Sequence, residues 1–355
     1  KSLIVGAGLA GEMLARDLLR SPGGSCEPML FVDDDPTKQG REIHGIRVSG
    51  LCDKIPEVVA RHEIELILIA LPSATSKQIQ RIVELCEKTG KPFRILPRLQ
   101  DLMSGQASIR DLRDVRIEDL LGRESVSLDW TSITRGVQGK TILVTGGGGS
   151  IGTELCRQVA RLKPAHLVIF EQSEFNLYSI ELELRQTFPD LRLTALLGDI
   201  YDAVAVEQML RAYRPTVILH AAAYKHVPML EHQLRAAVKN NALGARTLGS
   251  LAERHGCATC VMISTDKAVN PANIMGMTKR VAEIFCQNLS ARSSTHFITV
   301  RFGNVLGSAG SVIPLFQKQI AAGGPVMVTH PEITRYFMTI PEAAQLILQA
   351  GAMGR

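Results

Sequence analysis

Residues 141–152 read TILVTGGGGSIG, an apolar run that leads directly into a cluster of glycines. The run predicts a buried strand, and the apolar spacing that follows predicts a helix to about Leu162. Because Gly146, Gly149 and Gly152 lack a Cβ, backbone N–H groups and the helix N-terminus can approach a pyrophosphate closely. This strand, glycine loop and helix predict a dinucleotide-binding unit of a doubly wound α/β sheet.

An acidic residue stands where the ribose of a dinucleotide is recognised. Glu171 closes the next predicted strand, at residues 166–170, and lies 19 positions after Gly152. A carboxylate at this place accepts hydrogen bonds from the adenosine ribose diol and repels a 2′-phosphate, so we predict NAD as the cofactor rather than NADP. Further apolar runs predict strands near residues 193–197, 216–220, 260–264 and 297–301.

The same pattern occurs a second time near the N-terminus. Leu3–Val5 predicts a strand, residues 6–11 read GAGLAG, and Asp33 ends the next apolar run, at residues 29–32. Strands that alternate with helices predict a parallel sheet, so we expect two tandem Rossmann-like, doubly wound domains. Two interpretations of the first domain stay open: a site for a nucleotide or nucleotide sugar, and a packing or regulatory role.

Between the two patterns, over residues 121–139, the apolar periodicity lapses and polar residues dominate. We therefore predict an N-terminal Rossmann-like accessory domain at residues 1–125 and a linker at 126–139. An NAD-binding catalytic domain is expected at residues 140–355.

The composition excludes several classes of protein. The 355 residues are 45% apolar and 21% charged, which is typical of a globular chain and excludes a disordered or collagen-like one. No apolar run reaches the ~18 residues of a membrane-spanning helix. The net charge of +5 is unclustered, so we expect no nucleic-acid partner. Seven scattered cysteines, with the lone pair Cys257 and Cys260, predict reduced thiols and no metal site.

A second motif, STDK at residues 264–267, follows a predicted strand. Lys279 stands at the lysine of the YxxxK helix that marks extended short-chain dehydrogenase/reductases, and Met275 stands where that helix has its tyrosine. Further matching stretches are residues 220–228, 240–244, 301–308 and 334–339. Over nearly its whole length the chain resembles the bacterial nucleotide-sugar 4,6-dehydratases. Methionine in place of tyrosine is a feature of the large UDP-N-acetylglucosamine 4,6-dehydratases that retain configuration at C5.

The resemblance implies a role for each residue of this motif. Thr265 orients the C4 hydroxyl, Asp266 protonates the leaving water, and Lys267 removes the C5 proton. Lys279 holds the nicotinamide ribose, while Met275, which has no titratable proton, fills space beside the nicotinamide. The alternative interpretation is a surface pair, Asp266 and Lys267, that only caps the strand.

We expect the cofactor to contact residues around the glycine loop and the strand ends. These are Thr145, Gly146, Gly149, Ser150, Ile151, Gly152, Glu171, Asp199, Ile200, Ala221, Ala222, Ala223, Asn241 and Lys279. Asn241 either supports the lysine or forms a buried polar kink. The expected substrate contacts are Lys225, Asn304 and Arg335, each of which could instead be structural; an arginine suits a diphosphate through its bidentate fork.

The resemblance implies conversion of UDP-N-acetylglucosamine to UDP-2-acetamido-2,6-dideoxy-4-keto-hexose, with NAD recycled internally, for capsule, O-antigen or protein-glycan synthesis. A nucleotide-sugar epimerase and a catalytically silent NAD-sensing protein stay open as alternatives. We also expect a homo-oligomer on the cytoplasmic side of the bacterial inner membrane. Because the chain begins with Lys1 and stops at Arg355 within a matching segment, we expect a soluble fragment that lacks an upstream anchor and part of its C-terminal region.

Overall fold

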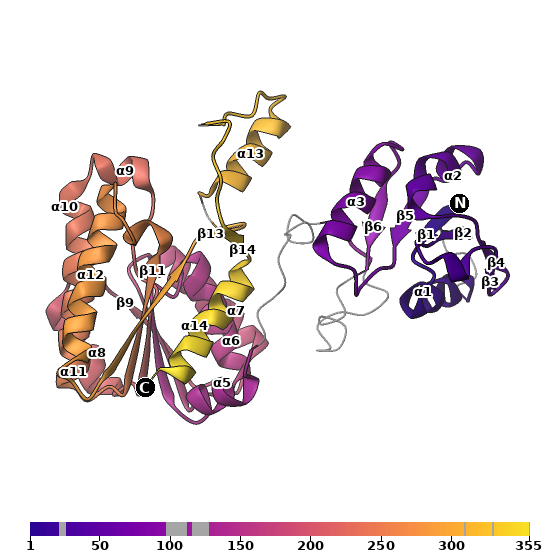
Figure 1. Cartoon of the computed structure of the whole chain (residues 1–355). Coiled ribbons are helices and arrows are strands. Elements are labelled where there is room, and N and C mark those ends of the chain that lie inside the picture. The colour runs from indigo at the N-terminus through magenta and orange to yellow at the C-terminus, as the bar shows by residue number, and fades with distance from the viewer. Residues whose placement is uncertain (21–25, 97–111, 116–127, 309, 329, 355) are drawn as a thin grey trace. The chain divides into compact units, whose positions relative to one another are not determined.

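A computed structural model describes residues 1–20, 26–96, 112–115, 128–308, 310–328 and 330–354. The chain divides into two compact units, Lys1–Glu124 and Ser125–Arg355 (Figure 1). Each unit contains a six-stranded, mainly parallel sheet. The predicted fold class, α/β with two tandem doubly wound sheets, is therefore confirmed.

In the first unit the sheet has the strand order β3-β4-β2-β1-β5-β6, and only the edge strand β3 runs antiparallel to its neighbour. Its elements are β1 (Ser2–Val5), α1 (Leu9–Leu19), β2 (Pro28–Val32), η1 (Pro36–Lys38), β3 (Glu42–Ile43), β4 (Ile46–Val48), η2 (Cys52–Lys54), α2 (Ile55–Arg61), β5 (Leu66–Ile69), α3 (Ser76–Glu87) and β6 (Phe93–Ile95).

The glycine loop of the first unit contacts the acid at the end of β2. The carboxylate of Asp33 accepts a hydrogen bond from the backbone N–H of Ala7 at 2.7 Å, and the Lys38 ammonium lies 3.0 Å from it. A Cβ at Gly11 would come within 1.9 Å of the Gly6 carbonyl oxygen, so α1 packs directly on the loop. The loop geometry predicted for this unit is thus present, with its acid already paired to a lysine.

The second unit has the strand order β12-β11-β10-β7-β8-β9, all parallel, which is the order of the Rossmann fold. Its elements are α5 (Trp130–Val137), β7 (Thr141–Thr145), α6 (Ser150–Arg161), β8 (His166–Glu171), α7 (Glu174–Thr187), β9 (Leu193–Leu197), α8 (Ala203–Tyr213), β10 (Val217–His220), α9 (Val227–Glu231), α10 (Leu234–Ala237), the π-helix η4 (Val238–Gly244), α11 (Ala245–Arg254), β11 (Thr259–Thr265), η5 (Asp266–Ala268), α12 (Ile274–Ser290), β12 (His296–Phe302), β13 (Asn304–Val305), α13 (Val312–Ala321), β14 (Phe337–Met338) and α14 (Ile340–Met353).

Both faces of this sheet are buried, as expected when helices cover each side of a parallel sheet. Along β7, Ile142 and Val144 face a core shared with α5, α6 and α14, whereas Leu143 faces a second core shared with α8 and α11. Figure 1 shows these two helical layers on either side of the strands. The strand order reverses at β7, so the carboxyl ends of β7 and β10 form the switch point where ligands bind in such folds.

The segment predicted as a linker, residues 126–139, contains the helix α5. Asp129 caps this helix by accepting a hydrogen bond from the backbone N–H of Ser132 at 3.0 Å. Ile133 and Val137 are buried in the same core as α14, which α5 contacts. The linker prediction is therefore wrong for residues 130–137, because the partner of these two apolar side chains lies some 200 positions later in the chain.

Two further findings concern membrane and metal binding. Within the part of the chain that the structure describes, no helix is both long and apolar enough to cross a membrane. The described His, Cys, Asp and Glu side chains form no group of three or more that could hold a metal ion. The thiols of Cys257 and Cys260 are buried, and burial raises the pKa of Cys257 to about 12.

Candidate functional site

The glycine loop between β7 and α6 lies against the segment that follows β10. Gly146 has a φ of +68°, and a Cβ there would come within 2.5 Å of the backbone nitrogen of Ala222. A Cβ at Gly152 would come within 2.0 Å of the Gly146 carbonyl oxygen. Only glycine fits these two positions, and α6 can therefore begin, at Ser150, in direct contact with the loop.

Glu171 at the end of β8 is held by the glycine loop itself. Its carboxylate accepts hydrogen bonds from the backbone N–H groups of Gly148 and Ser173, each at 3.0 Å. The residue is only 7% exposed and lines the pocket beside the loop. A carboxylate has about four acceptor sites, so two remain for a ribose diol.

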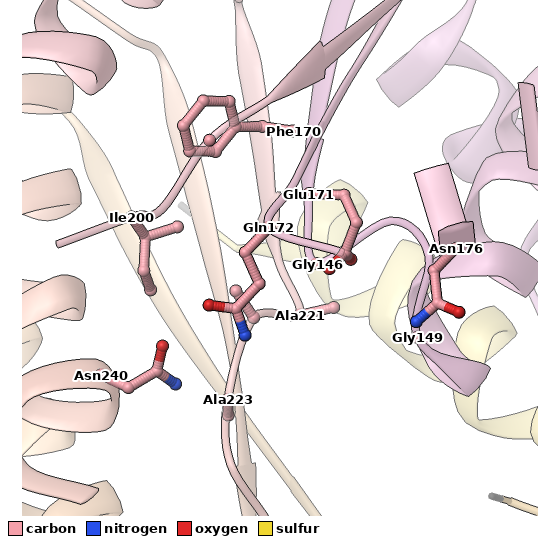
Figure 2. Close-up of a pocket in the computed structure, with 12 residues that line it drawn as sticks. Gly146, Gly149, Phe170, Glu171, Gln172, Asn176, Ile200, Ala221, Ala223 and Asn240 are labelled. Atoms are coloured by element: carbon pink, nitrogen blue, oxygen red, sulfur yellow. The ribbon is translucent and has the colours of Figure 1, made fainter. Parts of the chain in front are cut away.

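A pocket opens between the ends of β7, β8, β9 and β10 (Figure 2). The predicted cofactor residues that line it are Gly146, Gly149, Glu171, Ile200, Ala221, Ala222 and Ala223. The lining residues that the sequence analysis missed are Phe170, Gln172, Asn176, Gly198 and Asn240. Phe170, Gln172 and Gly198 lie within one residue of a strand end, a signal that could have found them, whereas Asn176 and Asn240 lie on helices and give no such signal.

Some predicted cofactor residues lie elsewhere. Asp199 is exposed, and its carboxylate accepts a hydrogen bond from the backbone N–H of Tyr201 at 2.9 Å. Ile151 packs against the core beneath α6. The fully buried hydroxyl of Thr145 lies 2.8 Å from Nδ1 of His220. Burial lowers the pKa of His220 to about 3, so the ring is neutral. Its contact with Thr145 links the carboxyl ends of β7 and β10.

Asn241, in the π-helix η4, ties two parts of the site together. Its side-chain oxygen accepts a hydrogen bond from the backbone N–H of Tyr224 at 2.8 Å. Its amide nitrogen donates to the Tyr224 carbonyl at 3.0 Å and to the Thr278 hydroxyl at 3.2 Å. These bonds fix the loop after β10 to α12 one residue before Lys279. π-Helical turns recur at functional sites. Here the turn positions the buried Asn241 amide between Tyr224 and Thr278.

Thr265, Asp266 and Lys267 form one hydrogen-bonded group at the carboxyl end of β11. One oxygen of Asp266, Oδ1, accepts a hydrogen bond from the Thr265 hydroxyl at 2.8 Å. The same oxygen accepts from the Lys267 ammonium at 2.9 Å. Burial alone would raise the pKa of Asp266, but these hydrogen bonds outweigh burial and the pKa lies below its usual value. The aspartate is therefore ionised at neutral pH.

Asn304 lies beside this group. Its side-chain oxygen accepts a hydrogen bond from the Lys267 ammonium at 3.1 Å, so the ammonium has two partners. The pairing of β13 with β14 puts Asn304 opposite Phe337, two residues from Arg335. Arg335 is exposed and donates to the Thr334 carbonyl at 2.7 Å. Lys225 is exposed on the loop after β10.

Met275 and Lys279 lie one turn apart on α12, and each is only 5% exposed. Met275 packs in an apolar cluster with Leu230 and Ala237. Burial lowers the pKa of Lys279 to about 8, although Cys286 and Glu283 oppose this shift. The lysine can therefore change its charge close to neutral pH.

Each of the two compact units contains the match to a different protein family. A family described as "Polysaccharide biosynthesis protein" matches residues 142–355, and one described as "CoA-binding domain" matches residues 1–97. The capsular polysaccharide biosynthesis protein CapD of Staphylococcus aureus is 45% identical over all of this chain. The chain spans only 60% of that relative's length.

Two other similar proteins match the second unit. An inverting UDP-N-acetylglucosamine 4,6-dehydratase of Campylobacter jejuni is 32% identical over 59% of this chain and 63% of the relative. The structure of the dTDP-glucose 4,6-dehydratase DesIV of Streptomyces venezuelae, with NAD bound, has a TM-score of 0.54 at 22% identity. That alignment covers 61% of this chain and 73% of DesIV, and it shows a shared fold.

Proposed function

Since the chain belongs to the polysaccharide biosynthesis protein family, we propose that it is an NAD-dependent UDP-N-acetylglucosamine 4,6-dehydratase that retains configuration at C5. The observation that carries this proposal is the joint hydrogen bonding of Thr265 and Lys267 to a single oxygen of Asp266. The group lies at the carboxyl edge of the sheet, where the glycine-loop pocket also opens. The product is the 4-keto-6-deoxy sugar nucleotide, which capsule, O-antigen or protein-glycan synthesis would consume.

The pocket fits NAD. A Cβ at Gly146 or at Gly152 would collide with backbone atoms. Because neither residue has one, the N–H groups of the loop and the N-terminus of α6 can approach a pyrophosphate. The carboxylate of Glu171 faces the position of the adenosine ribose and disfavours a 2′-phosphate. When bound, NAD would accept hydride from sugar C4 and later return it to C6.

Proton transfer falls to Asp266 and Lys267. In the free protein Asp266 is ionised and accepts a hydrogen bond from the Lys267 ammonium. Transfer of one proton along this bond gives a neutral amine and a neutral carboxylic acid. The amine can remove the C5 proton, and the acid can protonate the C6 hydroxyl as it leaves as water. Because the two groups share one proton, they titrate as a pair.

The remaining roles are those that the family resemblance implies for the matching residues. Met275 cannot take the C4 hydroxyl proton. Because Asp266 already holds the proton that it receives from Lys267, the C4 proton leaves to solvent beside the Thr265 hydroxyl, and a solvent proton restores the Lys267 ammonium after turnover. Lys279 donates to the nicotinamide ribose. Lys225 and Arg335 bind the diphosphate. We place the enzyme as a homo-oligomer at the cytoplasmic side of the bacterial inner membrane.

Mass spectrometry of UDP-N-acetylglucosamine after incubation with the protein tests this proposal. Loss of one water from the sugar nucleotide is the expected result. A product of unchanged mass with inverted C4 would instead identify an epimerase. Unreacted substrate at saturating NAD would contradict any catalytic assignment and favour a sensing protein.

A further inference from the structure

The side chain of Glu283 is a buried charged group to which no role has been given so far. It lies on α12, one helical turn after Lys279, and is 0% exposed. Its carboxylate accepts hydrogen bonds from the Ser264 hydroxyl at 2.6 Å and from Arg280 at 2.9 Å. Arg301 adds a bidentate pair, through Nε at 2.8 Å and through a terminal nitrogen at 2.5 Å. Four hydrogen bonds saturate the carboxylate.

These partners come from the two strands beside the reacting group. Ser264 is the residue of β11 directly before Thr265, and Arg301 of β12 lies opposite Ser264 in the parallel pairing. Glu283 therefore binds the carboxyl ends of both strands to the helix that carries Met275 and Lys279. Any shift of α12 relative to the strand end would stretch at least one of these bonds.

The charge of Glu283 is permanent under ordinary conditions. Burial alone would raise its pKa, but hydrogen bonds from Arg301, Ser264 and Arg280 hold that pKa at about 2. The other titratable groups that act on Lys279 are Cys286, whose pKa burial raises to about 11, and the neutral His220. Glu283 is thus the one of these three groups that is ionised at neutral pH.

We propose that Glu283 is a positioning residue for the proposed dehydratase site. It aligns the Thr265–Lys267 group with α12 and supplies a negative charge one turn from the buried Lys279 ammonium. The proposal rests on the proposed function only for the identity of the reaction; the alignment and the charge concern this chain alone.

The charge is tested with Glu283→Gln, which keeps the shape of the side chain. We expect NAD affinity of the unmodified protein to fall as pH rises through about 8, because Lys279 then loses its proton. In Glu283→Gln this midpoint should move down by ~1 pH unit or more, since an opposite charge has been removed. The matched control is Glu183→Gln, which breaks another bidentate arginine pair, with Arg157, away from the site. It should leave the midpoint unchanged.

The alignment is tested with Ser264→Ala, which removes one bond from the strand end and leaves the Glu283–Arg301 pair intact. We expect turnover to fall about tenfold, with little change in KM for the sugar nucleotide and with the wild-type pH midpoint. If Glu283→Gln does not fold, this variant alone decides the alignment. Wild-type turnover in Ser264→Ala, or an unshifted midpoint in folded Glu283→Gln, would show that Glu283 is only a structural ion pair.

A direct titration separates this proposal from the proposed function. The Lys279 amine can be followed by NMR in lysine-labelled protein without cofactor, and its resonance assigned with Lys279→Arg. A lowered Lys279 pKa in Glu283→Gln supports the charge role even if the protein proves inactive on UDP-N-acetylglucosamine. An unchanged Lys279 pKa overturns the charge role whatever the reaction is.

Discussion

The side-chain oxygen of Asn304 lies 3.1 Å from the Lys267 ammonium nitrogen, and Asp266 holds the same ammonium at 2.9 Å. Two acceptors thus fix the position of the proposed base, one charged and one neutral. The sequence predicts that Asn304 contacts the substrate, whereas in the structure its side-chain oxygen accepts a hydrogen bond from the Lys267 ammonium. A residue that orients the base affects the chemical step more than substrate binding.

Asn304→Ala should therefore lower kcat about tenfold and leave KM for UDP-N-acetylglucosamine nearly unchanged. The physical reason is that Lys267 loses one of its two acceptors and samples other positions. Steady-state kinetics can separate the two constants, with Arg335→Ala, which should mainly raise KM, as the comparison. A raised KM with wild-type kcat in Asn304→Ala would show instead that Asn304 binds the substrate and does not orient Lys267.

Glu171→Ala should weaken NAD binding and narrow the preference for NAD over NADP. The change removes the acceptor for the ribose diol and the charge that repels a 2′-phosphate. Because Gly148 and Ser173 also lose their acceptor, the melting temperature must be measured beside both affinities. Tighter binding of NADP by the unmodified protein would show that this role of Glu171 is wrong.

The buried Lys279 should make stability depend on pH in the alkaline range. Its pKa is about 8 in the folded protein, because of burial, against about 10.4 in an unfolded chain. Between these values the unfolded chain binds more protons, so this residue makes the free energy of unfolding rise with pH, by ~1.4 kcal/mol per unit. Urea unfolding of wild type and Lys279→Met across this window measures the difference in slope. Equal slopes would mean that the lysine is not desolvated.

The first unit offers a matched pair of glycine substitutions. A Cβ at Gly8 meets nothing within 4 Å, whereas one at Gly11 would meet the Gly6 carbonyl oxygen at 1.9 Å. Gly8→Val should therefore fold and place a side chain before the N-terminus of α1, while Gly11→Val should unfold the unit. Circular dichroism and NAD titration of both variants test this. Loss of NAD binding in folded Gly8→Val would place the cofactor of the reaction in the first unit.

The strands β7 to β12 of the second unit could be predicted from the sequence because they are largely apolar runs, whereas the short strands β13 and β14 were not predicted. The strand predicted at 260–264, for example, is Thr259–Thr265. Contacts between distant residues left no such pattern. No sequence pattern near Lys267 indicates its hydrogen bond to Asn304, which lies 37 positions later in the chain. Glu283 looks like an ordinary helical surface residue until the pairing of β11 with β12 puts Arg301 beside Ser264.

The central claim is that Lys267 removes the C5 proton, and the C5 hydrogen reports it directly. In deuterated water the wild-type protein should place deuterium at C5 of the product with the configuration retained. Lys267→Ala should lose this exchange and at least ~100-fold in turnover, the scale for a positioned general base. NMR of the sugar nucleotide measures the C5 position in both proteins. C5 exchange at the wild-type rate in Lys267→Ala would contradict the account and assign the base to another residue.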